Sequence, residues 1–239
     1  MSKKQDFVII ISADAEWRVV QELFPDGKYA ATPYGEWFDH FYTDHPPLAK
    51  PVVYFHGGWG KVAAAGSTQY SIDRWHPRMI INLGTCGGFE GDVDRGEIIL
   101  AEKTVIYDIF EQMGDPQEHL QHYSAELDLS WVTNSLPFEV RRKVLVSGDR
   151  DLYWQDVPEL KTRYGAIAGD WESGAIAWVA VKNHTPCFIL RGVTDLVGTS
   201  GGEAYNGNVD YYYQNTKLIM KKLVDSVPQW LCMYYARYS

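Results

Sequence analysis

Short apolar runs alternate with helical stretches along this chain, and no other feature of the sequence restricts the fold as much. The runs are continuous rather than alternating, which is typical of strands buried on both faces of a sheet. Four of them are Phe7–Ile11, Val52–His56, Met79–Leu83 and Phe188–Val193. Helical spacing marks Ala13–Leu23, Val62–Trp75, Val157–Tyr164, Glu172–Asn183 and Val209–Val227, the last ended by Pro228. This alternation predicts a largely parallel sheet with helices on its faces.

Other segments add strands that no helix separates. Tyr29–Thr43 is predicted to be a hairpin, and Glu97–Ile109 and Lys143–Ser147 are predicted strands, whereas Gly114–Pro137 is polar and resembles a loop or an insert. A chain of 239 residues with 46% hydrophobic residues has enough apolar material for one sizeable core. We therefore expect residues 1–239 to form a single three-layer α/β/α domain with a mixed, mostly parallel central sheet.

Charge and cysteine usage narrow the functional classes. A formal net charge of -9 and an isoelectric point near 5.2 disfavour a general binder of nucleic acid or of anionic membranes. No apolar run reaches the ~18 residues of a membrane span. The run Phe7–Ile11 is also too short for the core of a signal peptide, so it is better interpreted as a first strand. The three cysteines are too few for a disulfide scaffold, which indicates a reducing, cytoplasmic setting.

Acidic and small residues follow three of the predicted strands. Glu16 comes after the first strand, Gly84–Gly88 after the third, and Thr194-Asp195 after the last. Because ligands bind at the carboxyl ends of parallel strands, we expect these residues to meet at one edge of the sheet, together with Glu172. Acids at helix starts often serve only as caps or dipole partners, so each carboxylate alone has a structural interpretation. Together they fit glycosidic cleavage, which generally uses two carboxyl groups on opposite faces of a sugar.

The segment Gly57-Gly58-Trp59-Gly60-Lys61 looks like a phosphate-binding loop at first sight. A Walker loop needs a glycine separated by four residues from its Gly-Lys pair and a serine or threonine directly after the pair. Phe55 and Val62 occupy these positions, and the dinucleotide-binding spacing is also absent. The segment therefore predicts a tight turn that opens a helix, with ligand contact as an additional role.

Other polar features have structural interpretations. Asp170 is a candidate N-cap for the helix that follows it. The backbone of Gly84–Gly88 suits either a turn or a cradle for an anion or a sugar hydroxyl, and Cys86 has no base beside it that would make it a nucleophile. His119 and His122 lack the further ligands of a metal site and are interpreted as a solvated pair. We expect neither a metal nor an organic cofactor.

Several segments carry a family resemblance when they are taken in this order. They are Gly58–Ala65, Pro77, Ile80–Gly88, Gly96–Ile99, Tyr107-Asp108, Asp170–Ala175 and Leu190–Asp195. Over roughly residues 6 to 227 the chain resembles the nucleoside phosphorylase superfamily, and most closely its 5′-methylthioadenosine/S-adenosylhomocysteine nucleosidases. The resemblance implies the nucleoside phosphorylase-like fold.

The resemblance also implies roles for particular residues. Glu16 matches the glutamate that activates the attacking water, and Asp195 matches the acid that protonates the purine leaving group. Glu172 matches the glutamate that binds the ribose hydroxyls. Thr85 stands where the nucleosidases usually have serine, near the ribose and the water. Thr194 replaces the serine that supports the acid.

The resemblance is weaker around the sugar and the base. Trp171 replaces a methionine and is large enough to reshape the sugar pocket, while Cys86 and Gly87 are expected to contact substrate beside Thr85. The family places an aromatic residue that stacks on the base shortly after a Ser-Gly-Asp segment. Asp151 occupies that position here, so Tyr153 or Trp154 is expected to stack instead.

These features predict a cytoplasmic N-ribosyl hydrolase of nucleoside metabolism or purine salvage. The expected substrate is a purine nucleoside or a 5′-modified nucleoside that resembles methylthioadenosine or adenosylhomocysteine, with water as the nucleophile. One alternative is a phosphate-dependent phosphorylase. Phosphorylases carry arginines in the regions where this chain has Asn82 and Glu16, and this difference argues against that alternative. Another is a nucleoside-binding homologue without turnover. The resemblance suggests a homodimer or higher homo-oligomer, and no nucleic-acid or membrane partner is expected.

Overall fold

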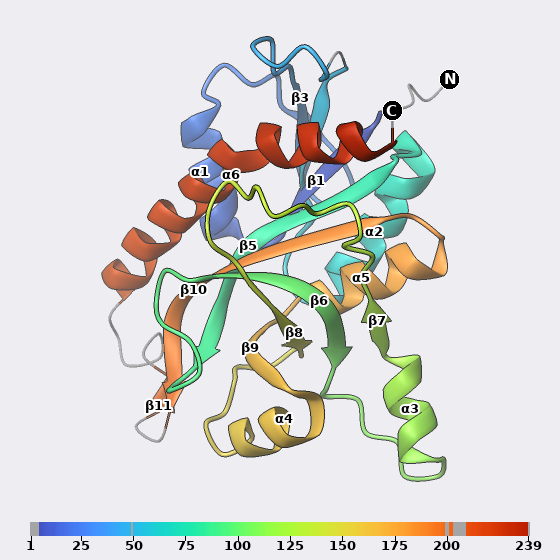
Figure 1. The fold of residues 1–239 in the computed structure, drawn as a ribbon, viewed down its shortest axis with the longest axis vertical. Helices are drawn as coiled ribbons and strands as arrows, with labels where there is room; N and C mark the ends of the chain where they lie inside the picture. The colour runs from blue at the N-terminus through green and yellow to red at the C-terminus, as the bar shows by residue number, and fades with distance from the viewer. Residues whose placement is uncertain (1–4, 49, 199–200, 203–208, 239) are drawn as a thin grey trace.

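An extended mixed sheet forms the centre of the molecule (Figure 1). The computed structural model describes residues 5–48, 50–198, 201–202 and 209–238. Within these ranges the strand order is β11-β10-β6-β8-β9-β5-β1-β4-β3-β2. The longer strands are β1 (Phe7–Ile11), β3 (Glu36–His40), β4 (Val52–His56), β5 (Met79–Phe89), β6 (Ile98–Ile106), β8 (Arg141–Ser147), β9 (Ala166–Asp170) and β10 (Cys187–Gly198). The short strands are β2 (Ala30–Ala31), β7 (Ser124–Glu126), which pairs with β6, and β11 (Gly201–Gly202).

Parallel pairing dominates the middle of the sheet. Strand β1 pairs in parallel with β4 and β5, and β5 pairs in parallel with β10. Strand β10 also pairs with β6, β6 with β8, β8 with β9, and β9 with β5. These five strands therefore close into a ring, an arrangement that the sequence pattern does not predict. The prediction of an α/β fold with a mixed sheet is confirmed: the longest pairings, β5–β10 and β6–β8, are parallel, whereas β10–β6 and β9–β5 are antiparallel.

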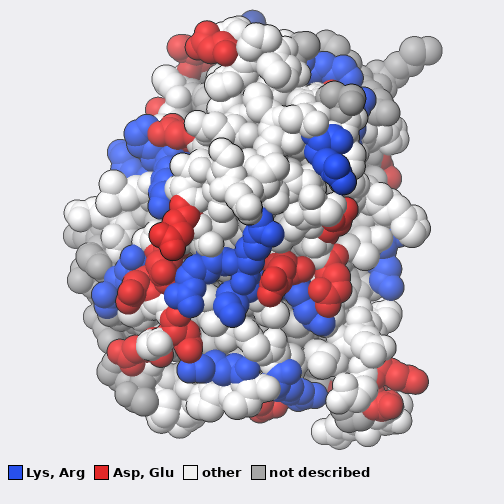
Figure 2. Space-filling model, viewed as in Figure 1, with Lys and Arg blue, Asp and Glu red and all other residues white. Residues whose placement is uncertain are grey.

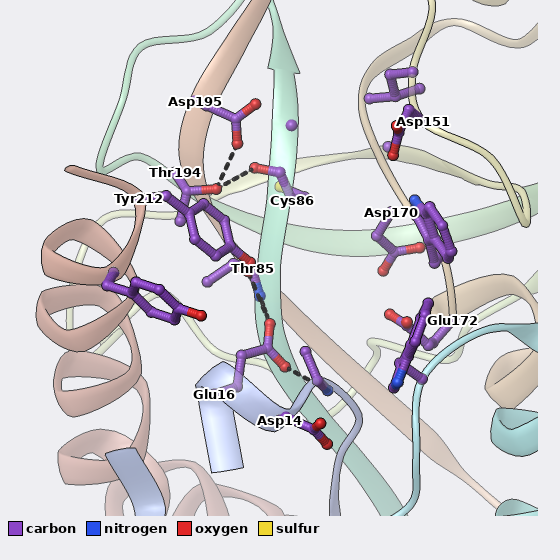
Figure 3. A pocket seen from close by; sticks show the side chains of 17 residues that line it. Asp14, Glu16, Thr85, Cys86, Asp151, Asp170, Glu172, Thr194, Asp195 and Tyr212 are labelled. Carbon is purple, nitrogen blue, oxygen red and sulfur yellow. Dashed lines mark hydrogen bonds between the residues drawn. The ribbon is translucent and has the colours of Figure 1, made fainter. Parts of the chain in front are cut away.

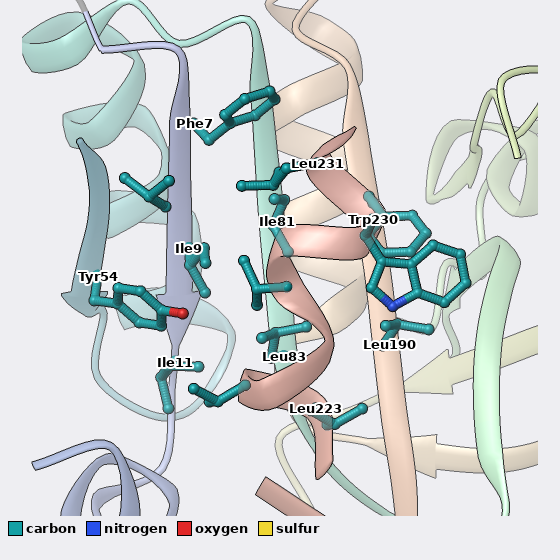
Figure 4. Packing of buried hydrophobic residues seen from close by; sticks show 14 of the residues in the cluster. Phe7, Ile9, Ile11, Tyr54, Ile81, Leu83, Leu190, Leu223, Trp230 and Leu231 are labelled. Atoms are coloured by element: carbon teal, nitrogen blue, oxygen red, sulfur yellow. The ribbon is translucent and has the colours of Figure 1, made fainter. Parts of the chain in front are cut away.

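Helices cover both faces of the sheet, and this explains why the apolar runs are continuous. Helices α1 (Asp14–Leu23) and α6 (Val209–Tyr238) pack on one face, where Ile9, Ile81 and Leu190 meet Leu223 and Trp230 (Figure 4). Helices α2 (Lys61–Trp75) and α5 (Ser173–Lys182) cover the other face, toward which alternate residues of the same strands turn. Because successive strand residues point to opposite faces, a strand covered on both sides must be apolar throughout.

Predicted and observed elements differ most at strand ends. Strand β5 continues to Phe89, so Gly84–Gly88 lies within the strand and not in a loop after it. Strand β10 similarly continues through Thr194 and Asp195 to Gly198. Strand β9 was not predicted, because its sequence Ala-Ile-Ala-Gly-Asp lacks the β-branched density of the other strands. Helix α4 (Val157–Tyr164) has the predicted bounds.

Pro228 does not end the last helix, although the sequence predicts that it does. Helix α6 continues to Tyr238, because Trp230, Leu231 and Tyr234 beyond the proline are buried in the core. A proline inside a helix removes one backbone hydrogen bond, and the burial of these side chains offsets that loss. The polar segment 114–137 is partly ordered into helix α3 (Pro116–His122) and β7. None of the helices in the described ranges combines the length and the apolar character needed to cross a membrane.

Candidate active site

A pocket of about 480 Å³ opens where β1, β5 and β10 end and α6 begins (Figure 3). Its walls come from the start of α1, the β4–α2 loop, β5, the loop after β8, the end of β9 and β10. The residues that line it are Ala13, Asp14, Glu16, Trp59, Thr85, Cys86, Gly87, Asp151, Leu152, Gly169, Asp170, Trp171, Glu172, Thr194, Asp195, Tyr212 and Tyr213. The predicted strand-end acids therefore do meet in one cavity.

Glu16 lies in the first turn of α1 and is buried at the pocket wall. Its Oε1 accepts hydrogen bonds from the backbone N–H of Thr85 at 2.6 Å and from the Thr85 hydroxyl at 2.8 Å, and its Oε2 accepts one from the N–H of Ala13 at 3.3 Å. Burial raises the pKa of the Glu16 carboxyl, while Arg191 and the bonds from Thr85 oppose that rise. A fixed carboxylate with a raised pKa can accept a proton from a water molecule that it orients.

Asp195 reaches the pocket because β10 carries an irregularity. Val193 pairs with Cys86 and Asp195 with Gly87, so Thr194 is an extra residue between two paired positions. Such a bulge breaks the alternation of side chains, and here both Thr194 and Asp195 face the pocket. The Thr194 hydroxyl lies 2.7 Å from Asp195 Oδ1 and 3.3 Å from the carbonyl oxygen of Cys86. When that hydroxyl donates to Cys86, its oxygen can accept a hydrogen bond from a protonated Asp195.

Glu172 occupies the N-cap position of α5 but does not cap the helix with its side chain. The Asp170 carboxylate accepts the N–H of Ser173 at 3.2 and 3.3 Å, so Asp170 supplies the capping hydrogen bond from two residues before Glu172 and is not itself the predicted N-cap. One oxygen of Glu172 accepts the N–H of Gly60 at 3.1 Å, and the carboxylate faces the pocket. Burial raises the pKa of Glu172 to about 8, with Arg191 opposing the rise. The purely structural interpretation of Glu172 as a cap is therefore wrong.

A buried arginine in β10 lies behind the pocket wall and joins its acids. Arg191 is 1% exposed; its guanidinium lies 2.7 Å from Asp170, 3.6 Å from Glu172 and 3.9 Å from Glu16. It also donates to Asn82 Oδ1 at 2.7 Å. Burial alone would lower the pKa of Arg191, but the surrounding carboxylates raise it. One buried cation thus offsets part of the charge of three acids, and a buried charge is stable only with such partners.

Aromatic side chains form part of the remaining wall. The indole rings of Trp59 and Trp171 lie 5.6 Å apart between centroids with an angle of 46° between their planes. Tyr212 lines the pocket near the start of α6, and burial raises its pKa to about 12. These rings offer flat apolar faces beside the carboxylates, as a site for a planar base or a sugar requires.

Charge in the pocket is one-sided. Six of its lining residues are carboxylic acids, and none of the described lining residues is lysine or arginine. Across the described part of the chain, no three His, Cys, Asp or Glu side chains are grouped in a way that holds a metal ion. The arrangement therefore offers proton donors, proton acceptors and hydroxyl binders rather than a cationic anion site.

Most predicted site residues line the pocket. Thr85, Cys86, Gly87, Trp171 and Thr194 do so together with the three acids Glu16, Glu172 and Asp195. Burial raises the pKa of the Cys86 thiol well above its usual value, which fits its interpretation as a residue that is not a nucleophile.

Tyr153 and Trp154 do not lie on the pocket wall, so the prediction that one of them stacks on the base is not supported. Tyr153 is 50% exposed, whereas the pocket is lined by Asp151 and Leu152. The Leu152 side chain fills the space beside Gly87 and Gly169, where added Cβ atoms would meet it at 3.0 and 2.9 Å. The chain after β8 therefore inserts a leucine where the sequence suggested an aromatic ring.

Sequence analysis missed several functional candidates. Arg191 had a detectable signal, because a lone cation inside an apolar strand needs buried anions as partners. Trp59 belongs to the loop Gly57–Lys61, which the sequence predicts to be chiefly a tight turn, with ligand contact as an additional role. Asp14, Tyr212 and Tyr213 had no local signal, since only the fold brings the starts of α1 and α6 to the pocket.

Comparisons with known proteins agree with this geometry. The family model of the phosphorylase superfamily matches residues 7–227. The chain is 28% identical over 199 residues to the 5′-methylthioadenosine/S-adenosylhomocysteine nucleosidase of Oceanobacillus iheyensis, covering 79% of this chain and 86% of that protein. It is 29% identical over 170 residues to the protein of the same name from Thermotoga maritima, covering 71% and 77% of the two chains.

Solved structures show the same fold. The Helicobacter pylori 5′-methylthioadenosine/S-adenosylhomocysteine nucleosidase with butyl-thio-DADMe-Immucillin-A superimposes with a TM-score of 0.76 at 18% identity, covering 95% of this chain and 99% of that one. The native futalosine hydrolase of Helicobacter pylori superimposes with a TM-score of 0.75 at 20% identity, covering 94% and 98%.

Proposed function

The chain belongs to the phosphorylase superfamily, and we propose that it is a nucleosidase that hydrolyses the N-glycosidic bond of a purine or 5′-modified nucleoside. The observation that carries the proposal is the meeting of Glu16, Glu172 and Asp195 in one pocket with different partners. The relatives named above as nucleosidases support the same activity. A substrate that resembles methylthioadenosine or adenosylhomocysteine is the finer part of the proposal.

In the proposed mechanism each acid has its own task. Asp195, supported by Thr194, protonates the purine as the bond to C1′ breaks and the ribose gains oxocarbenium character. Glu16 orients a water molecule toward C1′ and accepts its proton, so that the sugar gains a hydroxyl group and the base leaves neutral. Glu172 accepts hydrogen bonds from the ribose hydroxyls. Environments that differ between the acids allow one to donate a proton and another to accept one.

The pocket favours water over phosphate as the nucleophile. Phosphate binding generally needs lysine, arginine or a cluster of free backbone N–H groups. None of the pocket's described lining residues carries a cationic side chain, and the backbone N–H of Thr85 already donates to Glu16. Asn82 is buried, where its side chain donates to the Ile10 carbonyl and accepts from Arg191. These contacts argue against the phosphorylase alternative.

Assembly and location are part of the same proposal. The proposed assembly is a homodimer or higher homo-oligomer, and the exposed Phe110 and Met113, at 79% and 96%, are candidate contact residues. Cys86, Cys187 and Cys232 are free thiols, which supports a reducing, cytoplasmic setting. Light scattering on the purified protein measures the assembly directly.

A panel of nucleosides assayed with and without phosphate tests the proposal. We expect base release in phosphate-free buffer, with free ribose or its 5′-modified form as the second product. A strict requirement for phosphate, with a ribose 1-phosphate as product, would overturn the hydrolase assignment. A nucleoside that stays bound and uncleaved for hours would favour a binding protein.

A further inference from the structure

The loop between β4 and α2 is the sequence that resembled a phosphate loop and failed its spacing rule. The structure gives its lysine a different task. The Nζ of Lys61 bonds to the carboxylate of Asp108, which follows β6, and both side chains are largely buried, with exposures of 15% and 13%. A lysine held in this way is not available to a phosphate group.

The same ion pair belongs to a network that ties three loops together. The backbone N–H of Lys61 donates to Asp149 Oδ1 at 2.6 Å, and the backbone N–H of Asp149 donates to Asp108 Oδ2 at 2.8 Å. Asp108 follows β6, Asp149 follows β8, and Lys61 begins α2. The β4–α2 loop is therefore fixed at its carboxyl end by two carboxylates from two other loops.

That loop also holds the proposed sugar-binding acid. Gly60, next to Lys61, donates its N–H to Glu172 Oε1 at 3.1 Å, and Trp59 lines the pocket. Gly60 has a φ of 82°, which favours glycine, and an added Cβ would lie 3.3 Å from Asp149 Oδ1. The N–H that contacts the Glu172 carboxylate is thus one residue from the contacts of Lys61 with Asp108 and Asp149.

We propose that Lys61 is a positioning residue for ribose recognition, acting through Asp108 and Asp149 to hold the Gly60 N–H against Glu172. None of Lys61, Asp108 and Asp149 lines the pocket, so their effect is transmitted through the loop. The inference rests on the proposed function, because it assigns the orientation of Glu172 to the binding of a ribose diol. Displacement of a binding group by about 1 Å costs up to ~10²-fold in rate, so the effect is measurable.

The test compares Lys61→Met and Lys61→Arg with a matched control, Lys103→Met. Lys103 pairs with Glu126 at 2.8 Å between β6 and β7, and neither residue lines the pocket. Wild type and variants are assayed for kcat and KM with a ribonucleoside and its 2′-deoxy counterpart. We expect Lys61→Met to raise KM for the ribonucleoside about 5- to 20-fold and to reduce the preference for ribose. Lys61→Arg should retain most of the preference for ribose, and Lys103→Met should match wild type in kcat, KM and this preference.

An unchanged ribose-to-deoxyribose ratio in a folded Lys61→Met protein would overturn the inference, even if its melting temperature falls. Should Lys61→Met not fold, Asp108→Asn removes the charge pairing while it keeps an acceptor oxygen, and the same loss of ribose preference is expected. A failure of the proposed function gives a different result, namely no turnover by wild type. In that case titration calorimetry with the two nucleosides still measures whether Lys61→Met weakens the discrimination between them, and equal discrimination would again overturn the inference.

Discussion

Glu172 shows how a single side chain is kept available for a ligand. Its neighbour Asp170 takes over the capping of α5, and Arg191 and the Gly60 N–H hold the Glu172 carboxylate at the pocket wall. A charge-assisted hydrogen bond to a ribose hydroxyl contributes about 1.5–3 kcal/mol. The Glu172 side chain is therefore available to bind a ligand, and removing its charge should affect ligand binding rather than the stability of α5.

At or above pH 8, where a carboxyl group with a pKa of about 8 is ionised, Glu172→Gln should erode the preference for ribonucleosides over 2′-deoxynucleosides by about 10-fold or more, since each lost charge-assisted bond costs roughly 1.5–3 kcal/mol. The melting temperature near pH 5 should change little, because Asp170 still caps α5. Kinetics with both nucleosides and a thermal scan of the same variant check this. An unchanged ribose-to-deoxyribose ratio would remove Glu172 from the sugar site.

The same acid should make stability depend on pH. Burial raises its pKa from 4.5 to about 8, so between these values the folded protein binds more protons than the unfolded chain. Stability from this group is therefore present in full below pH 4.5 and is lost as pH rises toward 8. Relative to wild type, Glu172→Gln should become progressively more stable from pH 5 to pH 8, as measured by denaturant unfolding. A difference between the two proteins that does not vary with pH would contradict this.

Asp195 should contribute to the chemical step more than to binding. Asp195→Asn keeps the shape and the contact with Thr194 but removes the transferable proton. General acid catalysis is worth about 10²–10⁴-fold, so kcat should fall by at least ~10²-fold with little change in KM. Steady-state kinetics with a natural nucleoside measure the effect. If most of the turnover remains, another group supplies the proton.

At the level of residues, the sequence predicts the chemistry better than the shape of the pocket. Glu16 follows β1 and Asp195 lies toward the carboxyl end of β10, and these ends meet in this fold, so their position follows from topology. Tyr153 lies outside the pocket lining because one residue of offset decides which side chain a loop turns inward, and Leu152 packs there against Gly87 and Gly169. Such an offset depends on close packing, which no local pattern encodes.

Strands β5 and β10 contribute five of the residues that line the pocket, and the sequence predicts both strands too short for one reason. Glycines within Gly84–Gly88 and the aspartate Asp195 interrupt the apolar pattern, and glycine and aspartate are depleted in strands. Both segments nevertheless pair with each other along the ring of strands. The residues that interrupt the apolar pattern lie in the part of each strand that lines the pocket. From sequence alone, the same residues indicate the end of the strand.

Gly84 in β5 should tolerate no side chain, because its missing Cβ makes space for Arg191. A Cβ at position 84 would lie 1.9 Å from Arg191 Nη1 and 2.9 Å from Glu16 Oε1. Gly84→Ala must displace a buried cation from its carboxylates, which costs about 3–5 kcal/mol when one partner is lost. We expect a loss of that order in the free energy of unfolding, measured in denaturant, and a large loss of activity.

Gly114→Ala is the control for that substitution, since its added Cβ would meet only the Glu111 side chain, at 3.5 Å, in an exposed loop. This variant should match wild type in stability to within about 0.5 kcal/mol. Equal stability of Gly84→Ala and Gly114→Ala would mean that Arg191 has other space to occupy.

For the molecule as a whole, the alternation of strands and helices is enough to predict a sheet covered by helices, but it does not predict that five strands of the sheet close into a ring. The ring of β5, β10, β6, β8 and β9 needs β10 to pair on two sides with strands far apart in sequence, and pairings of this kind leave no local signal. The organisation of residues 1–239 as a single domain stays a prediction. Figure 2 shows acidic and basic side chains interspersed on one face rather than a continuous basic strip.

The one-sided charge of the pocket has a consequence for substrate choice. In Figure 3, Asp195 and Asp151 lie toward one end, Asp14 lies toward the other, and Glu16 and Glu172 are nearer to Asp14. With the base at Asp195 and the ribose at Glu16 and Glu172, the 5′ carbon points away from the base, toward Asp14. The Asp14 carboxylate lies 3.2 Å from His56, whose pKa is lowered chiefly by burial, so at pH 8 the imidazole leaves the charge of Asp14 uncompensated.

The proposed nucleosidase should therefore prefer a neutral or amine-bearing 5′-substituent to an anionic one. Among 5′-alkylthio nucleosides of equal length at pH 8, the aminoalkyl compound should have a higher kcat/KM than the carboxyalkyl compound. Asp14→Asn should reduce this ratio by up to about fivefold, because a largely exposed charge pair contributes only ~0.2–1 kcal/mol. Asp151→Asn, at the other end of the pocket, is the matched control and should leave the ratio unchanged. If Asp151→Asn changes the ratio and Asp14→Asn does not, the nucleoside lies in the pocket with its 5′ end reversed from the direction assigned above.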